Sequence, residues 1–340
     1  MRPVHAGLRP LAPWVVATAV ALAALLPTPA AAQSACQREP QLARPAVAAT
    51  LATVALNENA HMGGSLIDES GGLIQQGFYE AERDHLPGDE PAWRRVWNYW
   101  RAVPDVYARD FAPLEALGST AEQRVALIDH PWSAVFISWV MRSAGFTEAQ
   151  FDFSALHSDY VRAALDETAA EAARQPTDYA YRACDLAQTA PRVGDLLCFA
   201  RADDASLVTF DAVRAAVLQG SIPMHCDLVV KRDAAHIETV GGNVAQSVTL
   251  RRLRLAADGS GRLWPGYLES AHRAQAAALA GQPSAGTAAA LLPDTYLSQQ
   301  PWSVLLQLRN GVITTGTNPV VSPRLGGPPP PITPDSIYRN

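Results

Sequence analysis

The stretch from His130 to Gly145 constrains the fold of this 340-residue chain more than any other part of it. Pro131 suits the first turn of a helix because its ring fixes φ at a helical value, and Gly145 suits the left-handed position just beyond a helix end. Between these two signals Arg142 is the only charged residue, and apolar side chains cover nearly the whole circumference. We therefore predict one helix here, buried on most of its sides and central to the molecule.

Ser133 is the small polar exception in the first turn of this helix. Unpaired backbone N–H groups and the positive end of the helix dipole favour a developing negative charge at that place. Ser133 is therefore a candidate nucleophile. The simpler alternative is a serine that caps the helix or faces a sheet.

The N-terminus has the pattern of a secretory signal peptide. A basic start precedes an apolar run over 11–26, and small residues follow up to Ala32. We expect cleavage of residues 1–32 and a periplasmic or secreted protein. A lipoprotein anchored at Cys36 is disfavoured, because Gln33 stands where a lipobox normally has leucine. The apolar run is short for a bilayer-spanning helix and no later segment is long enough, so we expect no membrane span.

Composition and motifs narrow the classes of function. A formal net charge of −6 argues against nucleic acid as a partner. The four cysteines are an even number, which suits an oxidising compartment, and no C-x-x-C pair indicates zinc or thioredoxin-type chemistry. The chain also lacks a Gly-x-Ser-x-Gly elbow, a phosphate-binding glycine loop and a His-Glu-x-x-His motif. We expect no cofactor and no bound metal.

The chain has helix patterns first and strand patterns afterwards, an order that favours an α+β domain. Helices are predicted over 41–59, 74–85, 90–100, 119–128 and 131–144, followed by a helix that ends near 174. Strands are predicted within 191–200 and over 225–230, 236–240, 246–250 and 303–308, with a turn at 241–243. We predict a single domain over 41–312 and a Pro-rich disordered tail over 313–340.

Trp93, Trp97 and Trp100 recur at the spacing of one helical face. Such a stripe could stack on sugar rings, but large aromatic side chains on a helix usually serve to bury area. We therefore predict that the three tryptophans belong to the core.

His225 opens one predicted strand, and His236, Glu238 and Asn243 follow on the next strand and its turn. Together with Ser133 they supply the residue types of a nucleophile, a base and an orienting group. Each also has a structural alternative, such as a hydrogen-bonded histidine at a strand end or an asparagine that tolerates a left-handed turn.

Four sequence blocks carry a resemblance to a known family. They read Trp-Ser-Ala-Val-Phe-Ile-Ser-Trp at 132–139 with Ala-Gly at 144–145, Pro-Arg-Val-Gly-Asp-Leu-Leu at 191–197, His-Cys-Asp-Leu-Val-Val at 225–230 and Val-Gly-Gly-Asn at 240–243. In this order they resemble the NlpC/P60 and CHAP superfamily of papain-like cell-wall hydrolases, and more closely its DUF2272 branch of uncharacterised bacterial proteins.

The resemblance implies a papain-like fold of the NlpC/P60 type, in which a central buried helix packs on a small antiparallel sheet, with an added helical N-terminal region. It also implies a cysteine nucleophile at the helix start, a histidine on the sheet and a third polar residue after it. Here Ser133 stands at the cysteine position, His225 at the histidine and Asn243 at the third, with Glu238 as an alternative third group. A helix start can turn a thiol into a thiolate but cannot ionise a hydroxyl, so Ser133 needs His225 as general base and an oxyanion hole.

Further residues are expected around this centre. We predict that Trp132, His157, Tyr160 and Asp227 contact the substrate. The superfamily order places Cys198 and Cys226 on neighbouring strands, as buried thiols or as a disulfide, and leaves Cys36 and Cys184 as loop residues for another bridge.

These patterns predict a secreted or periplasmic hydrolase of amide bonds, with peptidoglycan or cell-wall peptide as its partner. One alternative is a catalytically inactive module of the same fold that binds the cell wall or a protein. Another is an envelope assembly factor that binds an envelope protein through its N-terminal helices and Pro-rich tail.

Overall fold

The computed structural model describes residues 35–36, 46–80, 85–86, 88–201, 206–267, 297–298 and 300–315. The predicted signal peptide, 1–32, lies outside these residues, and so does residue 316 onward of the predicted tail. No helix among the described residues is long and apolar enough to cross a membrane.

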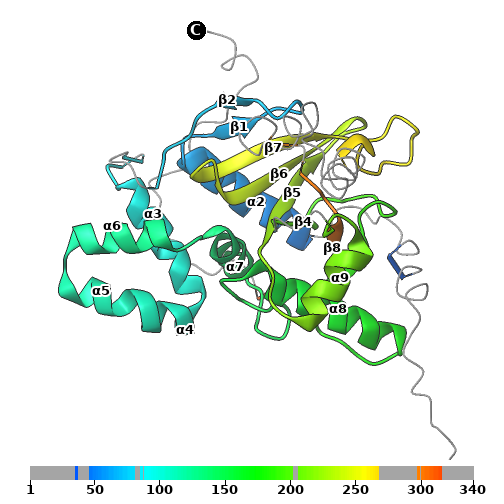
Figure 1. Cartoon of the computed structure of the whole chain (residues 1–340), viewed down its shortest axis with the longest axis horizontal. Coiled ribbons are helices and arrows are strands. Elements are labelled where there is room, and N and C mark those ends of the chain that lie inside the picture. Colours follow the sequence, from blue (N-terminus) through cyan, green and yellow to red (C-terminus); the bar gives the residue numbers. More distant parts are fainter. Residues whose placement is uncertain are drawn as a thin grey trace, which may run out of the picture.

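A mixed eight-stranded sheet forms the middle of the molecule (Figure 1), in the order β2-β1-β7-β6-β5-β4-β8-β3. Neighbouring strands are antiparallel except for β1 and β7, which run parallel. The strands are β1 (Ser65–Ile67), β2 (Leu73–Gln75), β3 (Tyr181–Asp185), β4 (Leu196–Ala200), β5 (Met224–Arg232), β6 (His236–Val244), β7 (Ser247–Arg254) and β8 (Val304–Leu308).

The α+β class is confirmed, but the predicted small antiparallel sheet is wrong in size and in strand direction. The sequence did not signal β1, β2 or β3. The first two have three residues each, too few to show an alternating pattern, and β3 is buried at four successive residues, so it does not alternate either.

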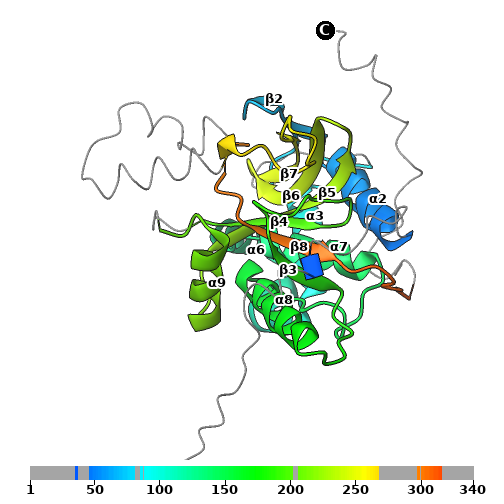
Figure 2. The ribbon, with the colours of Figure 1, turned by 90° about the vertical axis from the view of Figure 1, so that its right-hand side faces the viewer.

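Two groups of helices lie beside the sheet, in addition to α2 and α7. Figure 1 shows α3 to α6 as a lobe beside α7, and Figure 2 shows α8 and α9 next to each other below the strands. The helices are α2 (Ala46–His61), α3 (Ala92–Tyr99), α4 (Pro104–Val106), α5 (Ala112–Leu117), α6 (Thr120–Asp129), α7 (Ser133–Ser143), α8 (His157–Ala172) and α9 (Phe210–Gln219), with a 3₁₀ turn at Trp100–Ala102 and a π-helical turn at Tyr107–Phe111.

Helix α7 is the predicted central helix. It begins at Ser133, with Trp132 as its N-cap, so Pro131 lies just before the helix and not in its first turn. Beyond its end, Gly145 has φ of +82°. Every residue of α7 except Arg142 is buried, which confirms a helix enclosed on most sides.

Two predicted elements are wrong. Of the expected helix over 74–85, residues 74–75 belong to β2 and 76–80 form no helix, while 81–84 lie outside the described residues. A Cβ atom at Gly77 would come within 2.6 Å of the Met62 carbonyl oxygen. The expected turn at 241–243 is the end of β6, and the chain reverses at Ala245 and Gln246, which both have positive φ.

The core confirms the structural interpretation of the tryptophan stripe, since Trp93, Trp97 and Trp100 are all buried. Adjacent residues of β4 alternate between a large apolar cluster that includes α7 and a smaller cluster on the other face of the sheet. Two disulfides, Cys36–Cys184 and Cys198–Cys226, join the cysteines in the expected pairs, although Cys184 lies on β3 and not on a loop.

Candidate functional site

The start of α7 brings the hydroxyl of Ser133 against the first residue of α8. The distance from Ser133 Oγ to His157 Nε2 is 2.7 Å, and both side chains are 4 % exposed. The chain before α8 is held by α7 itself, because the Ser138 hydroxyl donates to the Ser154 carbonyl at 2.9 Å and accepts from the Ser154 N–H at 3.1 Å. The same helix that carries Ser133 therefore also fixes the approach of its imidazole partner.

Tyr160 extends the pair to a row of three side chains, Ser133, His157 and Tyr160, because its hydroxyl is hydrogen-bonded to Nδ1 of His157. Burial holds the pKa of His157 well below its ordinary value, and the nearby His225 and Arg201 lower it further. Burial also raises the pKa of the Tyr160 phenol well above its ordinary value. The row is therefore neutral at pH 7, with an imidazole that can accept a proton.

The proton arrangement of this row decides what it can do. A phenol can donate or accept a hydrogen bond. When Nδ1–H of His157 donates to Tyr160, Nε2 is free to accept the Ser133 proton. When Tyr160 donates, Nε2–H of His157 donates to Ser133 instead. Only the first arrangement makes His157 a general base.

A second pair lies on β5, where His225 and Asp227 share one face of the strand. His225 Nε2 is 2.7 Å from Asp227 Oδ1, and both residues are buried. Burial tends to raise the pKa of Asp227, but Arg251 and His225 outweigh it, so the pKa is lowered and the carboxylate is charged. Burial lowers the pKa of His225, against the opposing attraction of Asp227.

Two residues on neighbouring strands complete the surroundings of Asp227. The Thr239 hydroxyl donates to Oδ2 at 3.1 Å, and Arg251 Nη1 lies 3.3 Å from the same oxygen. Thr239 and Arg251 are direct cross-strand partners on β6 and β7. Neither residue could be predicted from the sequence, because the only available signal was strand alternation, which requires the β6–β7 register to be known.

The two groups meet through their imidazole rings. The ring centroids of His157 and His225 are 5.2 Å apart. Among the described residues, no hydrogen bond joins Ser133 to His225, so the hydroxyl is paired with the histidine of α8 and not with that of β5. The structure thus brings together five of the eight predicted site residues, namely Ser133, His157, Tyr160, His225 and Asp227.

Among the described residues, no hydrogen bond or ion pair joins the other three predicted residues to this group. Glu238 is 3.4 Å from Lys231 Nζ and does not join the group around His225. Asn243 has a left-handed φ of +53° within β6. Trp132 is fully buried and packs on Tyr99, with ring centroids 5.6 Å apart, so it supports the site from the core side.

Glu80 is a buried acid that the sequence analysis missed, because nothing in its local pattern marks it. Its backbone N–H donates to the Gln246 carbonyl at 3.2 Å, which places it beside the β6–β7 turn. Burial raises the pKa of Glu80 to about 7, and the indole of Trp132 offsets part of this effect. A titratable carboxyl thus lies next to the residue that precedes Ser133.

Within the described residues, no three His, Cys, Asp or Glu side chains form a group that could hold a metal ion. The site itself offers a buried hydroxyl, two imidazoles, a charged carboxylate and the first N–H groups of α7.

A hydroxyl–imidazole pair at the start of a buried helix, beside an imidazole–carboxylate pair on a sheet, defines this site. The chain belongs to DUF2272, a family described as uncharacterised proteins conserved in bacteria, whose model matches residues 88–308. The predicted family is thereby confirmed, and the five clustered site residues fall within the match. Comparison with curated proteins and with solved structures found no match.

Proposed function

We propose that this chain is a secreted or periplasmic hydrolase of amide bonds in cell-wall peptides, on a papain-like fold of the NlpC/P60 type. Ser133 is the nucleophile and His157 its general base. The observation that carries the proposal is the 2.7 Å contact between Ser133 Oγ and His157 Nε2 at the first residue of α7. The order of helix, Gly-Asp strand and His strand in the sequence supports the substrate class.

The proposed reaction needs no group beyond those of the site and water. Ser133 Oγ attacks the amide carbonyl carbon while His157 Nε2 takes the hydroxyl proton. The first N–H groups of α7 hold the oxyanion. The C–N bond then breaks, the amine leaves with the proton from His157, and water hydrolyses the acyl ester on Ser133.

The base differs from the one that the sequence predicted. Tyr160 takes the position that a carboxylate has in Ser-His-Asp sites, where the third group orients the imidazole and stabilises the imidazolium. A neutral phenol supplies the orientation but not the charge, so we expect slow turnover. His225 and Asp227 form the adjacent pair, and His225 becomes a positioning residue for His157.

One observation favours a second candidate function, a non-catalytic module that binds the cell wall or a protein partner. Ser133 and His157 are 4 % exposed and His225 is 2 % exposed, so a substrate must open the site to reach the hydroxyl. In a non-catalytic module the hydrogen bond between Ser133 and His157 would have a structural role and hold α7 against α8.

The test is release of soluble peptides from purified peptidoglycan, measured by mass spectrometry. Ser133→Ala and His157→Gln should each lower the rate at least about 100-fold, the usual size of a lost general base. His225→Gln should lower it less than His157→Gln. Ser143→Ala is the matched control, because Ser143 lies buried at the other end of the same helix with no hydrogen-bond partner for its hydroxyl among the described residues.

Several results would contradict the hydrolase. Full activity in Ser133→Ala would exclude the nucleophile, and full activity in His157→Gln would exclude the base. A wild-type protein that sediments with peptidoglycan but releases no peptide, together with a Ser133→Cys variant that gains activity, would support the binding module.

A further inference from the structure

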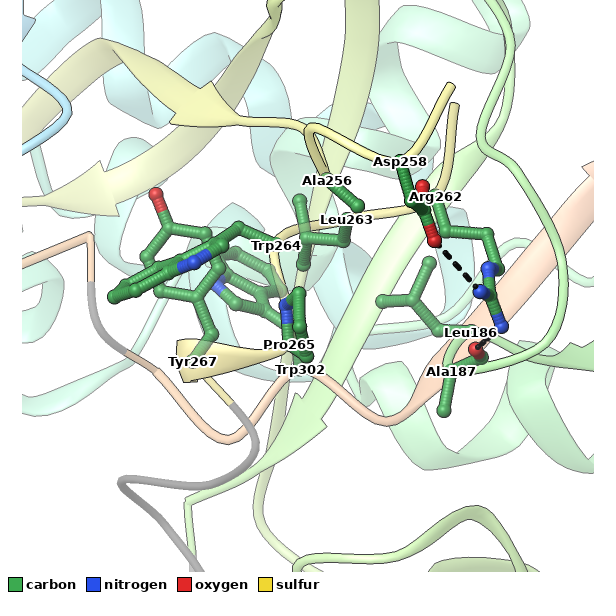
Figure 3. Close-up of a pocket in the computed structure, with 10 residues that line it drawn as sticks. All are labelled: Leu186, Ala187, Ala256, Asp258, Arg262, Leu263, Trp264, Pro265, Tyr267 and Trp302. Atoms are coloured by element: carbon green, nitrogen blue, oxygen red, sulfur yellow. Dashed lines mark hydrogen bonds and ion pairs between the residues drawn. The ribbon is translucent and has the colours of Figure 1, made fainter. Parts of the chain in front are cut away.

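A cavity of about 110 Å³ lies beside the smaller apolar cluster, outside the site described above. Figure 3 shows three aromatic rings at one end of it and an Asp258–Arg262 ion pair at the other. Its walls are formed by Leu186, Ala187, Ala256, Asp258, Arg262, Leu263, Trp264, Pro265, Tyr267 and Trp302.

Four polar side chains of these walls, those of Tyr267, Trp302, Arg262 and Asp258, already have partners. The Tyr267 hydroxyl accepts a hydrogen bond from the Arg254 N–H at 3.1 Å, and Trp302 Nε1 donates to the Ser298 carbonyl at 3.0 Å. Arg262 donates to Asp258 at 3.1 Å, so the only two charges of the lining neutralise each other. Water inside would find few partners, and cavities of that kind favour an apolar guest.

The size and shape of the cavity restrict the guest further. A cavity of roughly 150 Å³ is known to admit benzene, so about 110 Å³, open at one side, accepts a single ring inserted by its edge or a branched aliphatic group. Trp264 and Tyr267 stand edge to face with centroids 5.3 Å apart, an arrangement that presents both a ring face and a ring edge to a third ring.

We propose that this cavity is a binding site for an uncharged apolar group of single-ring size, carried by a ligand whose polar part stays outside at the Asp258–Arg262 pair. The same chemistry is found in a free aromatic alcohol and in the aromatic side chain of a peptide. The site does not depend on the proposed hydrolase activity.

Trp302 links the cavity to the residues around Asp227. The guanidinium of Arg251 lies 5.5 Å from the Trp302 ring centroid, and the same guanidinium is paired with Asp227. Phe199 packs on Trp302 with centroids 4.9 Å apart and on His225 with centroids 5.5 Å apart. A guest that contacts Trp302 therefore changes the surroundings of His225.

The experiment titrates the full chain with benzyl alcohol and, separately, with N-acetyl-phenylalanine amide, and follows binding by ligand-observed NMR. Saturable binding is expected, with an affinity at least tenfold weaker in Ala256→Leu, because the added side chain fills the cavity. Ala257→Leu is the matched control, since Ala257 is the exposed neighbour that does not line the cavity. Ala187→Leu is a second variant that fills the cavity, and it carries little risk to folding because Ala187 is an exposed lining residue.

Binding of benzyl alcohol alone would assign the site to free small molecules, and binding of both probes would include peptide side chains. No saturable binding of either probe, or equal affinity in wild type and both filled variants, would overturn the proposal. In wild type the ring resonances of His225 should shift on binding. Binding without that shift would overturn the link through Trp302.

Discussion

Two buried histidines dominate the residue scale, because each is kept neutral by burial. The pKa of His157 lies well below the ordinary value of 6.5, and that of His225 is also lowered. In the unfolded chain both bind a proton as the pH falls through about 6.5, whereas the folded chain resists. The unfolded state therefore takes up more protons at these two residues, and their contribution to stability falls as the pH falls below about 6.5.

His157→Gln should remove one of the two histidines that make the free energy of unfolding depend on pH. Below pH 6.5 the free energy of unfolding of the variant should depend on pH less steeply, by about 1.4 kcal/mol per pH unit. The measurement is urea unfolding at several pH values between 5 and 8. Ser133→Ala is the control, because it removes the partner of His157 and leaves both imidazoles in place. Equal slopes in wild type and His157→Gln would show that the folded chain protonates His157 normally.

Glu80 changes the pH dependence of stability in the opposite direction. Burial raises its pKa from 4.5 to about 7, so the stability that the protonated carboxyl contributes is fully present below pH 4.5 and is lost as the pH rises through 7. Glu80→Gln keeps the shape and removes the titration. At pH 8 we expect the variant to be more stable than wild type by up to about 3 kcal/mol, and at pH 4.5 we expect no difference. A difference that is the same at both pH values would contradict a buried carboxyl with a raised pKa.

At the scale of elements, a buried ion pair fastens α2 to α3. Arg95 donates to both carboxylate oxygens of Glu58 at 2.6 Å, and Tyr99 donates to one of them. Glu58 and Arg95 are buried, and the Arg95 guanidinium lies 5.1 Å from the Trp139 ring centroid on α7. The pair therefore connects the N-terminal helices to the helix that carries Ser133.

Arg95→Met should leave the Glu58 carboxylate buried without its cation, at a cost of about 3 to 5 kcal/mol. Replacing both residues, as Glu58→Leu with Arg95→Met, should cost less than Arg95→Met alone, since no charge is then stranded. Unfolding in urea measures both variants. Glu58→Leu alone completes the cycle, and a double variant whose loss equals the sum of the losses in Glu58→Leu and Arg95→Met would show that the two side chains do not interact.

Elements whose start, end and apolar pattern are encoded by neighbouring residues were predictable from sequence. Elements whose conformation depends on close contact with distant residues were not. Helix α7 has its stop signal at Gly145 and its apolar residues in one continuous stretch. The end of β6 looked like a turn because Gly241 and Gly242 are adjacent. In the structure a Cβ atom at Gly241 would lie 1.9 Å from Asp227 Oδ1, and one at Gly242 would lie 2.4 Å from the Phe136 side chain. These glycines make room for the site and do not reverse the chain.

The candidate site was predicted only in part, again because sequence patterns report local features and not long-range packing. Residue type, position near the start of an element and the family resemblance marked Ser133 and His225, whereas Asp227 was predicted only as a substrate contact. The pairing of Ser133 with His157 depends on how the chain before α8 packs on α7, through Ser138. No local pattern encodes that packing, so the sequence named His157 as a site residue but did not pair it with Ser133.

At the scale of the whole molecule, the sheet order joins distant parts of the chain. Strand β1, near the N-terminal end of the described residues, runs parallel to β7, and β3 pairs with β8 at the far edge. The Cys36–Cys184 disulfide adds a covalent link between the segment before α2 and β3, across 148 residues of chain. The Cys198–Cys226 disulfide spans only 28 residues and joins strands that are already paired.

The longer bridge should therefore contribute more to stability through the unfolded chain. Loop-closure entropy predicts that removing a bridge across 148 residues costs about 4 to 5 kcal/mol and one across 28 residues about 3 to 4 kcal/mol. We expect Cys36→Ala with Cys184→Ala to lower the free energy of unfolding, measured in urea without reductant, and to leave the near-UV spectrum of the tryptophans unchanged.

Cys198→Ala with Cys226→Ala is the comparison. Its loss includes any repacking between β4 and β5 at the rung beside His225, so it should also alter the ring resonances of His225. If opening the Cys36–Cys184 bridge leaves stability unchanged, the segment at Cys36 does not constrain the unfolded chain, and the sheet alone joins the two ends of the domain.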